Sequence, residues 1–276
     1  YFSAKLYTGN ESNLNITGLD FAPNWVWIKD RTTDHSHCLY DSVRGVQKRL
    51  QSNNNEEEGT DAQGVTAFNS DGFTIGNSSS VNQNTDSFVS WNWKCETSFT
   101  NDASSTGIGT IDTAGKINTT AGISILTYTG NDQVATYAHG LGAVPKMILI
   151  KRRDANSSNW QVYHGSLGGT LFLKLNSTDA QEDKDSRWND TNPTSSVVTI
   201  STAANLNANN ASYISYNFAD VKGYSKFSSF VGNGSSDGTY VHLGFKPAFV
   251  MVKQTNASGE GWHILDNKRS GVNGDM

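Results

Sequence analysis

The chain has little of what disulfide-rich, helical or membrane-spanning proteins need. Its 276 residues include two cysteines, four prolines and three methionines, and only 17% of them are charged. No apolar run approaches the ~18 residues that a membrane span requires. Helices rely on Ala, Leu, Glu and Lys, whereas Ser, Thr, Asn and Gly dominate here. The composition predicts short strands joined by polar turns, with no insertion into a membrane.

The charge and the cysteines exclude two further classes of protein. The net charge is −5, and no basic cluster is larger than Lys151–Arg153, so we expect no nucleic-acid partner. Cys38 and Cys95 have no counterparts later in the chain. A structural disulfide would recur with a repeated unit, so two buried free thiols are the favoured interpretation, although a disulfide between them stays open.

What the chain does have is internal repetition. Three segments share one order of motifs: a Tyr-Thr-Gly-Asn strand (Phe-Val-Gly-Asn in the third), a turn with Leu and Gly followed by proline, and an apolar strand that ends in lysine. The first motif occurs at 7–10, 128–131 and 230–233, and the lysines are Lys29, Lys151 and Lys253. Such repetition has to be recognised before single residues are interpreted, because it sets the architecture.

A second motif recurs independently of the first. Residues 82–93 match residues 207–218 without a gap, and each copy ends in an alternating aromatic strand. We therefore predict repeat 1 at 1–115, repeat 2 at 121–222 and a partial repeat 3 at 223–276. In a superposition of the first two, Lys29 should coincide with Lys151.

Alternation within the motifs predicts the fold class. In 88–93, Val89, Trp91 and Trp93 fall on one face, and Ser90 and Asn92 fall on the other. This is the pattern of a half-buried strand. We expect an all-β protein of tandem antiparallel β-sandwich repeats, jelly-roll or lectin-like, since propeller blades repeat at only ~40–50 residues. The segment 44–51 is the best helical candidate, and 97–120 resembles a linker.

Candidate chemistry is sparse. His35 and His37 have a spacing that metals use, but the other copies lack the pair, which favours a solvated loop. The run Tyr40-Asp41-Ser42 could be drawn as part of a hydrolase triad, yet no Gly-x-Ser-x-Gly elbow supports it. The acidic run 182–185 could bind calcium, although a solvated loop is the simpler interpretation. The sequence assigns no catalytic residue, no metal ligand and no cofactor.

Aromatic residues offer one further binding candidate. The aromatics that recur in the alternating strands are expected to pack in the core. Trp160, Trp188 and Trp262 are less clearly internal. These three tryptophans are the candidates for contact with glycans.

The motifs together resemble a known family. They are Tyr-Thr-Gly-Asn, the Gly-Leu-x-Phe-x-Pro turn with its apolar strand, and the runs 39–45, 68–73 and 91–93. The set is similar to a domain family of unknown function that is repeated in large structural proteins of marine bacteriophages. The resemblance spans nearly the whole chain. It implies a virion appendage or tail-fibre protein with lectin-like β-sandwiches, and it assigns no residue a catalytic role.

From the repetition and this resemblance we expect a non-enzymatic virion component, such as part of a tail fibre, spike or capsid appendage. Its expected partners are copies of itself or other virion proteins, and host-surface glycans through adhesion. The alternative is a carbohydrate-binding module or a polysaccharide-degrading enzyme, which would need two converging carboxylates. Half a sandwich cannot readily offset its own ordering entropy. Residues 223–276 should therefore be ordered only through packing on repeat 2, through a neighbouring chain, or because further sequence follows Met276.

Overall fold

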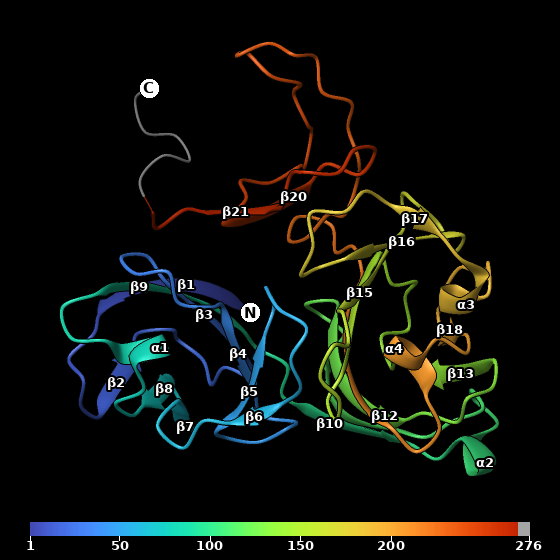
Figure 1. Ribbon diagram of the computed structural model, residues 1–276, viewed down its shortest axis with the longest axis horizontal. Coiled ribbons are helices and arrows are strands. Elements are labelled where there is room, and N and C mark those ends of the chain that lie inside the picture. Colours follow the sequence, from blue (N-terminus) through green and yellow to red (C-terminus); the bar gives the residue numbers. More distant parts are fainter. Residues whose placement is uncertain (270–276) are drawn as a thin grey trace.

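The computed structural model describes residues 1–269, and they form an all-β protein with four one-turn helices (Figure 1). The elements of the first part are β1 (Phe2–Thr8), β2 (Leu14–Thr17), β3 (Trp25–Asp30), β4 (Cys38–Asp41), β5 (Lys48–Gln51), β6 (Gly59–Thr60), β7 (Val65–Asn69), β8 (Gly72–Ile75), α1 (Ser79–Asn82) and β9 (Ser87–Trp93). Next come β10 (Thr97–Asn101), α2 (Ala103–Thr106), β11 (Thr113–Asn118), β12 (Ile123–Thr129), β13 (Ala135–Ala138), β14 (Met147–Arg152), β15 (Gln161–His164), β16 (Leu171–Lys174), β17 (Glu182–Asp183), α3 (Asp185–Trp188), β18 (Val197–Ile200), α4 (Ala204–Asn207) and β19 (Ser212–Phe218). The last two strands are β20 (Phe249–Lys253) and β21 (Trp262–Asp266).

Two large antiparallel sheets carry the fold. The first has the order β1-β9-β3-β4-β5-β6. The second contains β12-β19-β14-β15-β16-β17, with β11 and β10 added beside β12. Corresponding strands therefore occupy the same places. Lys29 lies opposite Val89, and Lys151 lies opposite Ile214, as the alignment of the two segments requires.

A small sheet covers one face of each large sheet. The three-stranded sheet β2-β8-β7 packs on the first through a core that includes Val26, Ile28 and Phe73. The pair β13-β18 packs on the second in the same way. Neither arrangement closes into a barrel within the described residues. The architecture is thus sandwich-like, as the sequence predicts at this coarser level.

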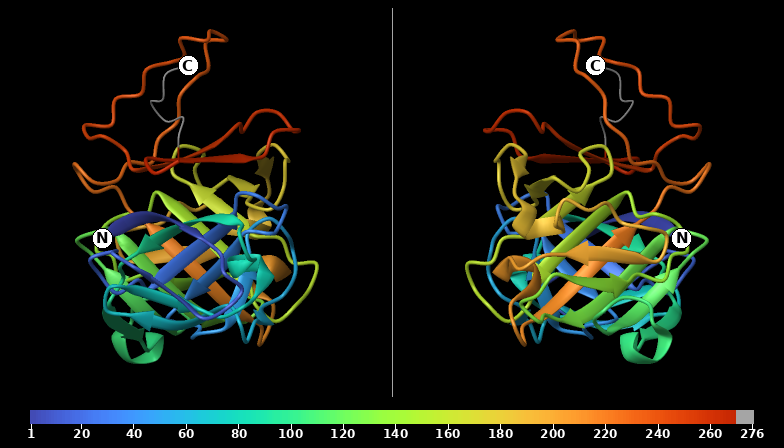
Figure 2. Two further views of the ribbon diagram at one scale, coloured as in Figure 1. Left: turned by 90° about the vertical axis from the view of Figure 1, so that its left-hand side faces the viewer. Right: turned by 90° about the vertical axis from the view of Figure 1, so that its right-hand side faces the viewer.

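The opposite faces of the large sheets meet in one shared core. This core contains Trp27 and Trp91 from the first sheet and Ile125, Trp160 and Tyr216 from the second. The hairpin β20-β21 lies across the top of both sheets, as Figures 1 and 2 show, and Phe249 packs against Trp91 at 5.8 Å between ring centroids. The recurring aromatics are core residues as predicted, but the core that they form lies between segments.

The polar face of the aromatic strands is also buried, so the expectation of a half-buried strand is wrong. Ser90 and Asn92 are fully buried in β9, as are Ser215 and Asn217 in β19. Most of their polar groups bond to protein, although Asn92 Oδ1 is buried without a hydrogen-bond partner among the described residues. Tyr137 Oη lies 2.9 Å from Asn217 Oδ1, to which it donates, and within 2.8 Å of Ser215 Oγ. Burial on both faces follows because the small sheets cover the side that the sequence pattern leaves polar.

The two recurring motifs bind each other. The backbone N–H of Asn10 donates to Asn82 Oδ1 over 2.9 Å, and that of Asn131 donates to Asn207 Oδ1 over the same distance. Glycine is needed beside these asparagines because a Cβ at Gly9 would collide with the carbonyl oxygen of Gln83. A Cβ at Gly130 would collide in the same way with the carbonyl oxygen of Ala208. The Tyr-Thr-Gly-Asn motif is therefore a docking point for the segment that precedes the aromatic strand.

The recurring lysines also have a structural role. Lys29 Nζ donates to the carbonyl of His35 over 2.7 Å, and Lys151 Nζ donates to that of Ser158 over 2.7 Å. Lys253 Nζ donates in the same way to Glu260 over 2.6 Å. Each ammonium closes the loop that follows its strand. Burial lowers the pKa of Lys151 to about 8, because the charged ammonium loses solvation by water inside the protein.

Two expectations about local structure are wrong. The segment 97–120 is no linker, because β10 and β11 extend the eight-stranded sheet. Its Ser, Thr, Gly and Asn content suits an outer strand as well as a loop, so composition could not separate the two. The segment 44–51 is a turn followed by β5, since pairing with β4 overrides its helical pattern.

Candidate functional site

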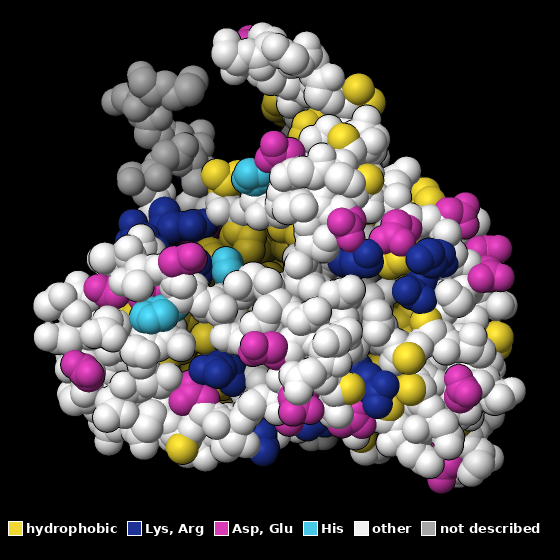
Figure 3. Space-filling view, viewed as in Figure 1, with side chains coloured by type: hydrophobic (Ala, Val, Ile, Leu, Met, Phe, Trp, Pro, Cys, Tyr) yellow, Lys and Arg dark blue, Asp and Glu magenta, His cyan; other side chains and the backbone are white. Residues whose placement is uncertain are grey.

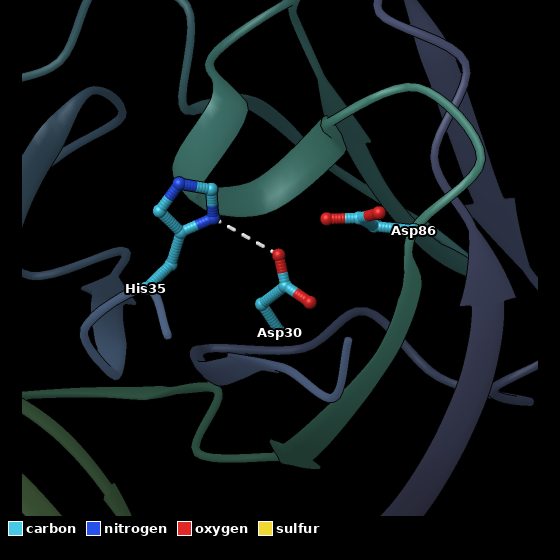
Figure 4. Close-up of side chains that lie close together, drawn as sticks. All are labelled: Asp30, His35 and Asp86. Carbon is cyan, nitrogen blue, oxygen red and sulfur yellow. Dashed lines mark hydrogen bonds and ion pairs between the residues drawn. The ribbon is translucent and has the colours of Figure 1, made fainter. Parts of the chain in front are cut away.

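The only group of three potential metal-ligating side chains among residues 1–269 is formed by Asp30, His35 and Asp86. Asp30 ends β3, His35 lies in the loop after it, and Asp86 directly precedes β9. One ligand atom from each lies within 4.8 Å of the others. Figure 4 shows the imidazole turned toward Asp30, with His35 Nδ1 at 2.9 Å from Asp30 Oδ2.

Three of the four carboxylate oxygens of this cluster, all but Asp86 Oδ1, have protein partners. Asp30 Oδ1 accepts from the N–H groups of Thr32 and Thr33 over 2.8 and 3.0 Å. Asp86 Oδ2 accepts from Thr33 Oγ1 over 2.7 Å. Burial by itself would raise the pKa of Asp30, but these N–H donors and His35 outweigh it and lower that pKa. The carboxylate of Asp30 is thus held charged within a turn.

Chemically, one imidazole and two carboxylates could provide three ligands for a zinc ion. A metal would have to replace the bond between His35 and Asp30. Arg152 takes the place of Asp30 in the corresponding register of β14, so the second sheet lacks the cluster. The arrangement serves best as a clamp that ties the loop after β3 to the start of β9.

The sequence could not identify this cluster, because Asp86 is remote from His35 and joins it only when β9 pairs with β3. His35 and His37, for which the sequence favours a solvated loop over a metal pair, do not share one site. His37 Nδ1 accepts from Trp27 Nε1 over 2.9 Å, and its ring stacks on Trp91. Burial, with Lys29 and Arg269 nearby, lowers the pKa of His37 to about 4. Both histidines are half-buried and bonded to protein rather than solvated.

A buried ionic network lies between the two large sheets. Asp41 Oδ2 accepts from Arg44 Nε over 2.5 Å and from Tyr216 Oη over 2.7 Å. Arg44 also contacts Glu58 at 3.1 Å, and Glu58 accepts two bonds of 2.9 Å from Arg153. The side chains of Asp41 and Arg44 are fully buried. The network therefore joins the first sheet to the second, and it is closed to water at its Asp41–Arg44 end.

The hairpin β20-β21 repeats the first half of this contact. Asp266 Oδ2 accepts from Arg269 Nε over 2.5 Å and from Trp91 Nε1 over 3.0 Å. Trp91 and Tyr216 hold the same place in β9 and β19, opposite Trp27 and Leu149. One Asp-Arg pair thus binds β19 and the other binds β9 in the same manner.

These bonds leave no catalytic relay at Tyr40-Asp41-Ser42. Tyr40 Oη donates to Asp61 over 2.9 Å, and Ser42 Oγ accepts from Asn24 over 3.1 Å. Asp41 serves Arg44 and Tyr216 instead of a histidine. The three side chains therefore have separate structural partners.

The predicted glycan-contact residues occupy buried or half-buried positions. Trp160 is 0% exposed and its Nε1 donates to the carbonyl of Gln51; Trp188 is 1% exposed. Neither offers a ring face at the surface, because each fills a core between sheet and neighbouring segment. Trp262 is half-buried and donates to the carbonyl of Lys174 over 2.9 Å. Placed in this way, Trp160 and Trp188 are not available to stack on a sugar.

Within the acidic run at 182–185, Glu182 is paired with lysines. Glu182 lies 2.6 Å from Lys174 and 3.2 Å from Lys184, and these cations lower its pKa, Lys174 first. Its oxygen atoms are thus engaged by ammonium groups rather than free to gather around a cation. Both cysteines are free and buried, and burial raises the pKa of Cys38 and of Cys95 to about 12.

A family model for a domain of unknown function, DUF7483, matches residues 1–275. The chain belongs to the DUF7483 family. The match takes in both large sheets and the β20-β21 hairpin as one family domain, which agrees with the expected membership in a family of unknown function. Comparison with curated proteins and with solved structures gave no significant match. Within residues 1–269 of this chain, no helix is long and apolar enough to cross a membrane.

Proposed function

We propose that this DUF7483 chain is a non-enzymatic structural component of a bacteriophage virion, in a tail fibre, spike or capsid appendage. It is built from tandem β-sandwich units, the third of which is partial. Its buried polar groups hold units together, and its surface meets other virion proteins or host glycans. An array of rigid units gives reach, and many weak contacts with a host surface add up to strong attachment.

The recurring contact between units is the observation that supports this most. Asp41 accepts from Tyr216, and Asp266 accepts from Trp91, so the same kind of buried contact holds successive segments of this chain together, as a rigid array would need. Arg44 and Arg269 each neutralise the acceptor carboxylate. Buried charge pairs of this kind are costly to break from one side, which suits a device that fixes how units meet.

Mass spectrometry and immunogold labelling of purified virions test the proposal. We expect peptides of this chain in intact particles, and gold particles at one appendage. Particles from the same lysate, stripped of appendages by shearing, are the matched control and should lose the label. Absence of the chain from purified particles would refute the proposal.

The rival function is a carbohydrate-binding module or a polysaccharide-degrading enzyme. Incubation with host-derived polysaccharide, followed by assay of new reducing ends, separates it from ours. We expect no release above that of heat-denatured protein. Release that disappears when a single Asp or Glu is mutated would make the chain an enzyme.

A further inference from the structure

The cluster of Asp30, His35 and Asp86 brings two buried carboxylates together. Asp30 is 1% exposed and Asp86 is 8% exposed, and their carboxyl groups lie within hydrogen-bond reach of each other. Among residues 1–269, the only ion pair that either carboxylate makes is the one between Asp30 and His35. Like charges repel strongly where water is excluded, so two such carboxylates favour a proton or a cation between them.

The second sheet has a cation at the same place. Arg152 holds the position of Asp30, and its Nε pairs with Asp154 Oδ1 at 2.7 Å. Asp154 Oδ2 accepts from the N–H of Ser212, at the start of β19, over 2.9 Å. A cation and a carboxylate thus fasten the loop after β14 to the aromatic strand. In the first sheet two carboxylates and one imidazole do this work, and the permanent positive charge of the counterpart is missing.

The lysine beside the cluster is occupied by other groups. Lys29 Nζ donates to the carbonyl oxygens of His35 and Thr33, over 2.7 and 3.5 Å, instead of pairing with a carboxylate. On the face of residues 1–269 that Figure 3 shows, acidic side chains are scattered among lysines and arginines rather than gathered in one patch. A cation that binds this molecule would therefore be held by a particular set of ligands and not by a broad acidic surface.

The three side chains are turned toward one another and are held in place (Figure 4). Asp30 Oδ1 and Asp86 Oδ2 accept from N–H and hydroxyl groups of the loop, which orients both carboxylates. Asp30 Oδ2, Asp86 Oδ1 and His35 Nδ1 are then the atoms that can bind a metal. Ligand atoms of a tetrahedral zinc ion lie about 3.3 Å apart. The 2.9 Å between His35 Nδ1 and Asp30 Oδ2 needs only a small widening to admit the ion.

An ion can reach this cluster from solvent. The side chain of His35 is 27% exposed, and the loop residues 31–34 that precede it are exposed. Entry therefore requires movement of a surface loop and no separation of the sheets. Three protein ligands leave the fourth position of a tetrahedral ion for a water molecule.

We propose that Asp30, His35 and Asp86 form a binding site for one zinc ion. A nitrogen ligand with two carboxylates suits zinc, whereas calcium and magnesium take oxygen ligands. The ion replaces the hydrogen bond between His35 and Asp30 with a bond from each, and it adds a bond from Asp86. It tightens the clamp between the loop after β3 and the start of β9, and it supplies the charge that Arg152 supplies in the second sheet. This role does not depend on the virion location.

Isothermal titration calorimetry tests the proposal, with zinc chloride added to the untagged chain after treatment with EDTA. Asp86→Asn is the first test variant, because its amide oxygen still accepts from Thr33 Oγ1 but the negative charge is lost. His35→Gln is the second, since this residue lies in a partly exposed loop and not in the core. His263→Gln is the matched control, because it removes a surface histidine that lies 3.7 Å from Glu260.

We expect saturable binding of one zinc ion per chain. Both test variants should weaken it at least about tenfold, and the control should bind zinc as the native chain does. Zinc should also slow hydrogen exchange in the loop 31–35 and at the start of β9. Circular dichroism of the zinc-free variants separates a lost site from a lost fold, and if Asp86→Asn fails to fold, His35→Gln decides.

Three results would overturn the proposal. The first is the absence of saturable zinc binding to the native chain. The second is binding that a folded test variant retains in full, or that His263→Gln weakens as much as the test variants do. The third is binding of calcium or magnesium that is tighter than that of zinc.

Discussion

Tyr216 illustrates how much of this molecule depends on single polar atoms placed between segments. Its hydroxyl, in the second sheet, donates to the buried carboxylate of Asp41 in the first sheet, which also pairs with Arg44. A buried charge that loses one partner keeps its desolvation penalty. Single substitutions in this network should therefore affect the stability of the whole molecule.

Removing that hydroxyl should be costly. For Tyr216→Phe we expect a loss of about 1.5–3 kcal/mol in the free energy of unfolding, as for other hydrogen bonds to charged groups. Urea denaturation measures it. Tyr163→Phe, which loses a bond of 3.2 Å to the neutral Asn192, should cost only about 1 kcal/mol. Equal losses in the two variants would contradict a special role for Asp41.

Glu58 should make stability depend on pH. Burial tends to raise its pKa, but hydrogen bonds and charges of Arg153 and Arg44 outweigh this, so the folded pKa lies below the usual value. Its contribution is complete above the unfolded pKa of about 4.3 and is lost as pH falls through the lower folded pKa. Urea denaturation at about pH 7 and about pH 3 should show a smaller acid loss for Glu58→Gln than for the native chain. If Glu58→Gln loses as much stability in acid as the native chain, the ion pairs of Glu58 contribute nothing to stability.

The two thiols should report opening of the fold. Burial raises the pKa of Cys38 and Cys95 to about 12, so the reactive thiolate is scarce and inaccessible near neutral pH. We expect no reaction with Ellman's reagent in the native state and reaction of both thiols in urea. Stoichiometric labelling without denaturant would contradict their placement.

At the scale of elements, the β20-β21 hairpin is ordered by what it touches. Asp266 binds β9 through Trp91, and Trp262 binds β16 through the carbonyl of Lys174. Phe249 adds contacts with Phe2 and Trp93. The hairpin thus contacts the first sheet as well as the second, whereas the sequence led us to expect packing on repeat 2; residues 270–276 lie outside the described part.

Removing the indole N–H that binds Asp266 should loosen the hairpin before it loosens the sheets. For Trp91→Phe we expect faster hydrogen exchange in 249–266, because Asp266 and Arg269 lose their anchor. Trp27→Phe is the matched control, since its indole donates to His37 and not to the hairpin. Faster exchange in both variants alike would mean that the hairpin is held by general packing.

At the scale of the whole molecule, the two large sheets share one aromatic core instead of each closing its own. Trp25 stacks on Tyr216 at 4.5 Å between centroids, across the boundary between the sheets. Apolar burial is the main favourable contribution to folding, and here much of it lies between segments. We therefore expect cooperative unfolding of the two sheets. Coincident urea transitions monitored by fluorescence and by circular dichroism would agree, and separate transitions would not.

The sequence by itself determined the all-β class, the positions of β3, β9, β14 and β19, and the burial of their aromatic residues. These features depend on alternation and on turn residues, which are local properties of the chain. Lys29 and Lys151 also hold corresponding registers beside β9 and β19.

The tertiary structure decided which faces meet. Ser90 and Asn92 look like a solvent-facing row in the sequence, yet the small sheet buries them because β2 and β8 fold over that face. Asp86 reaches His35 only after β9 pairs with β3. Trp160 becomes a core residue where the two large sheets meet, and Trp188 where the small sheet packs on the second large sheet. The alternation of polar and apolar residues predicts that a strand has two different faces. It does not predict what covers each face, because contacts between residues far apart in the chain depend on how the sheets pack.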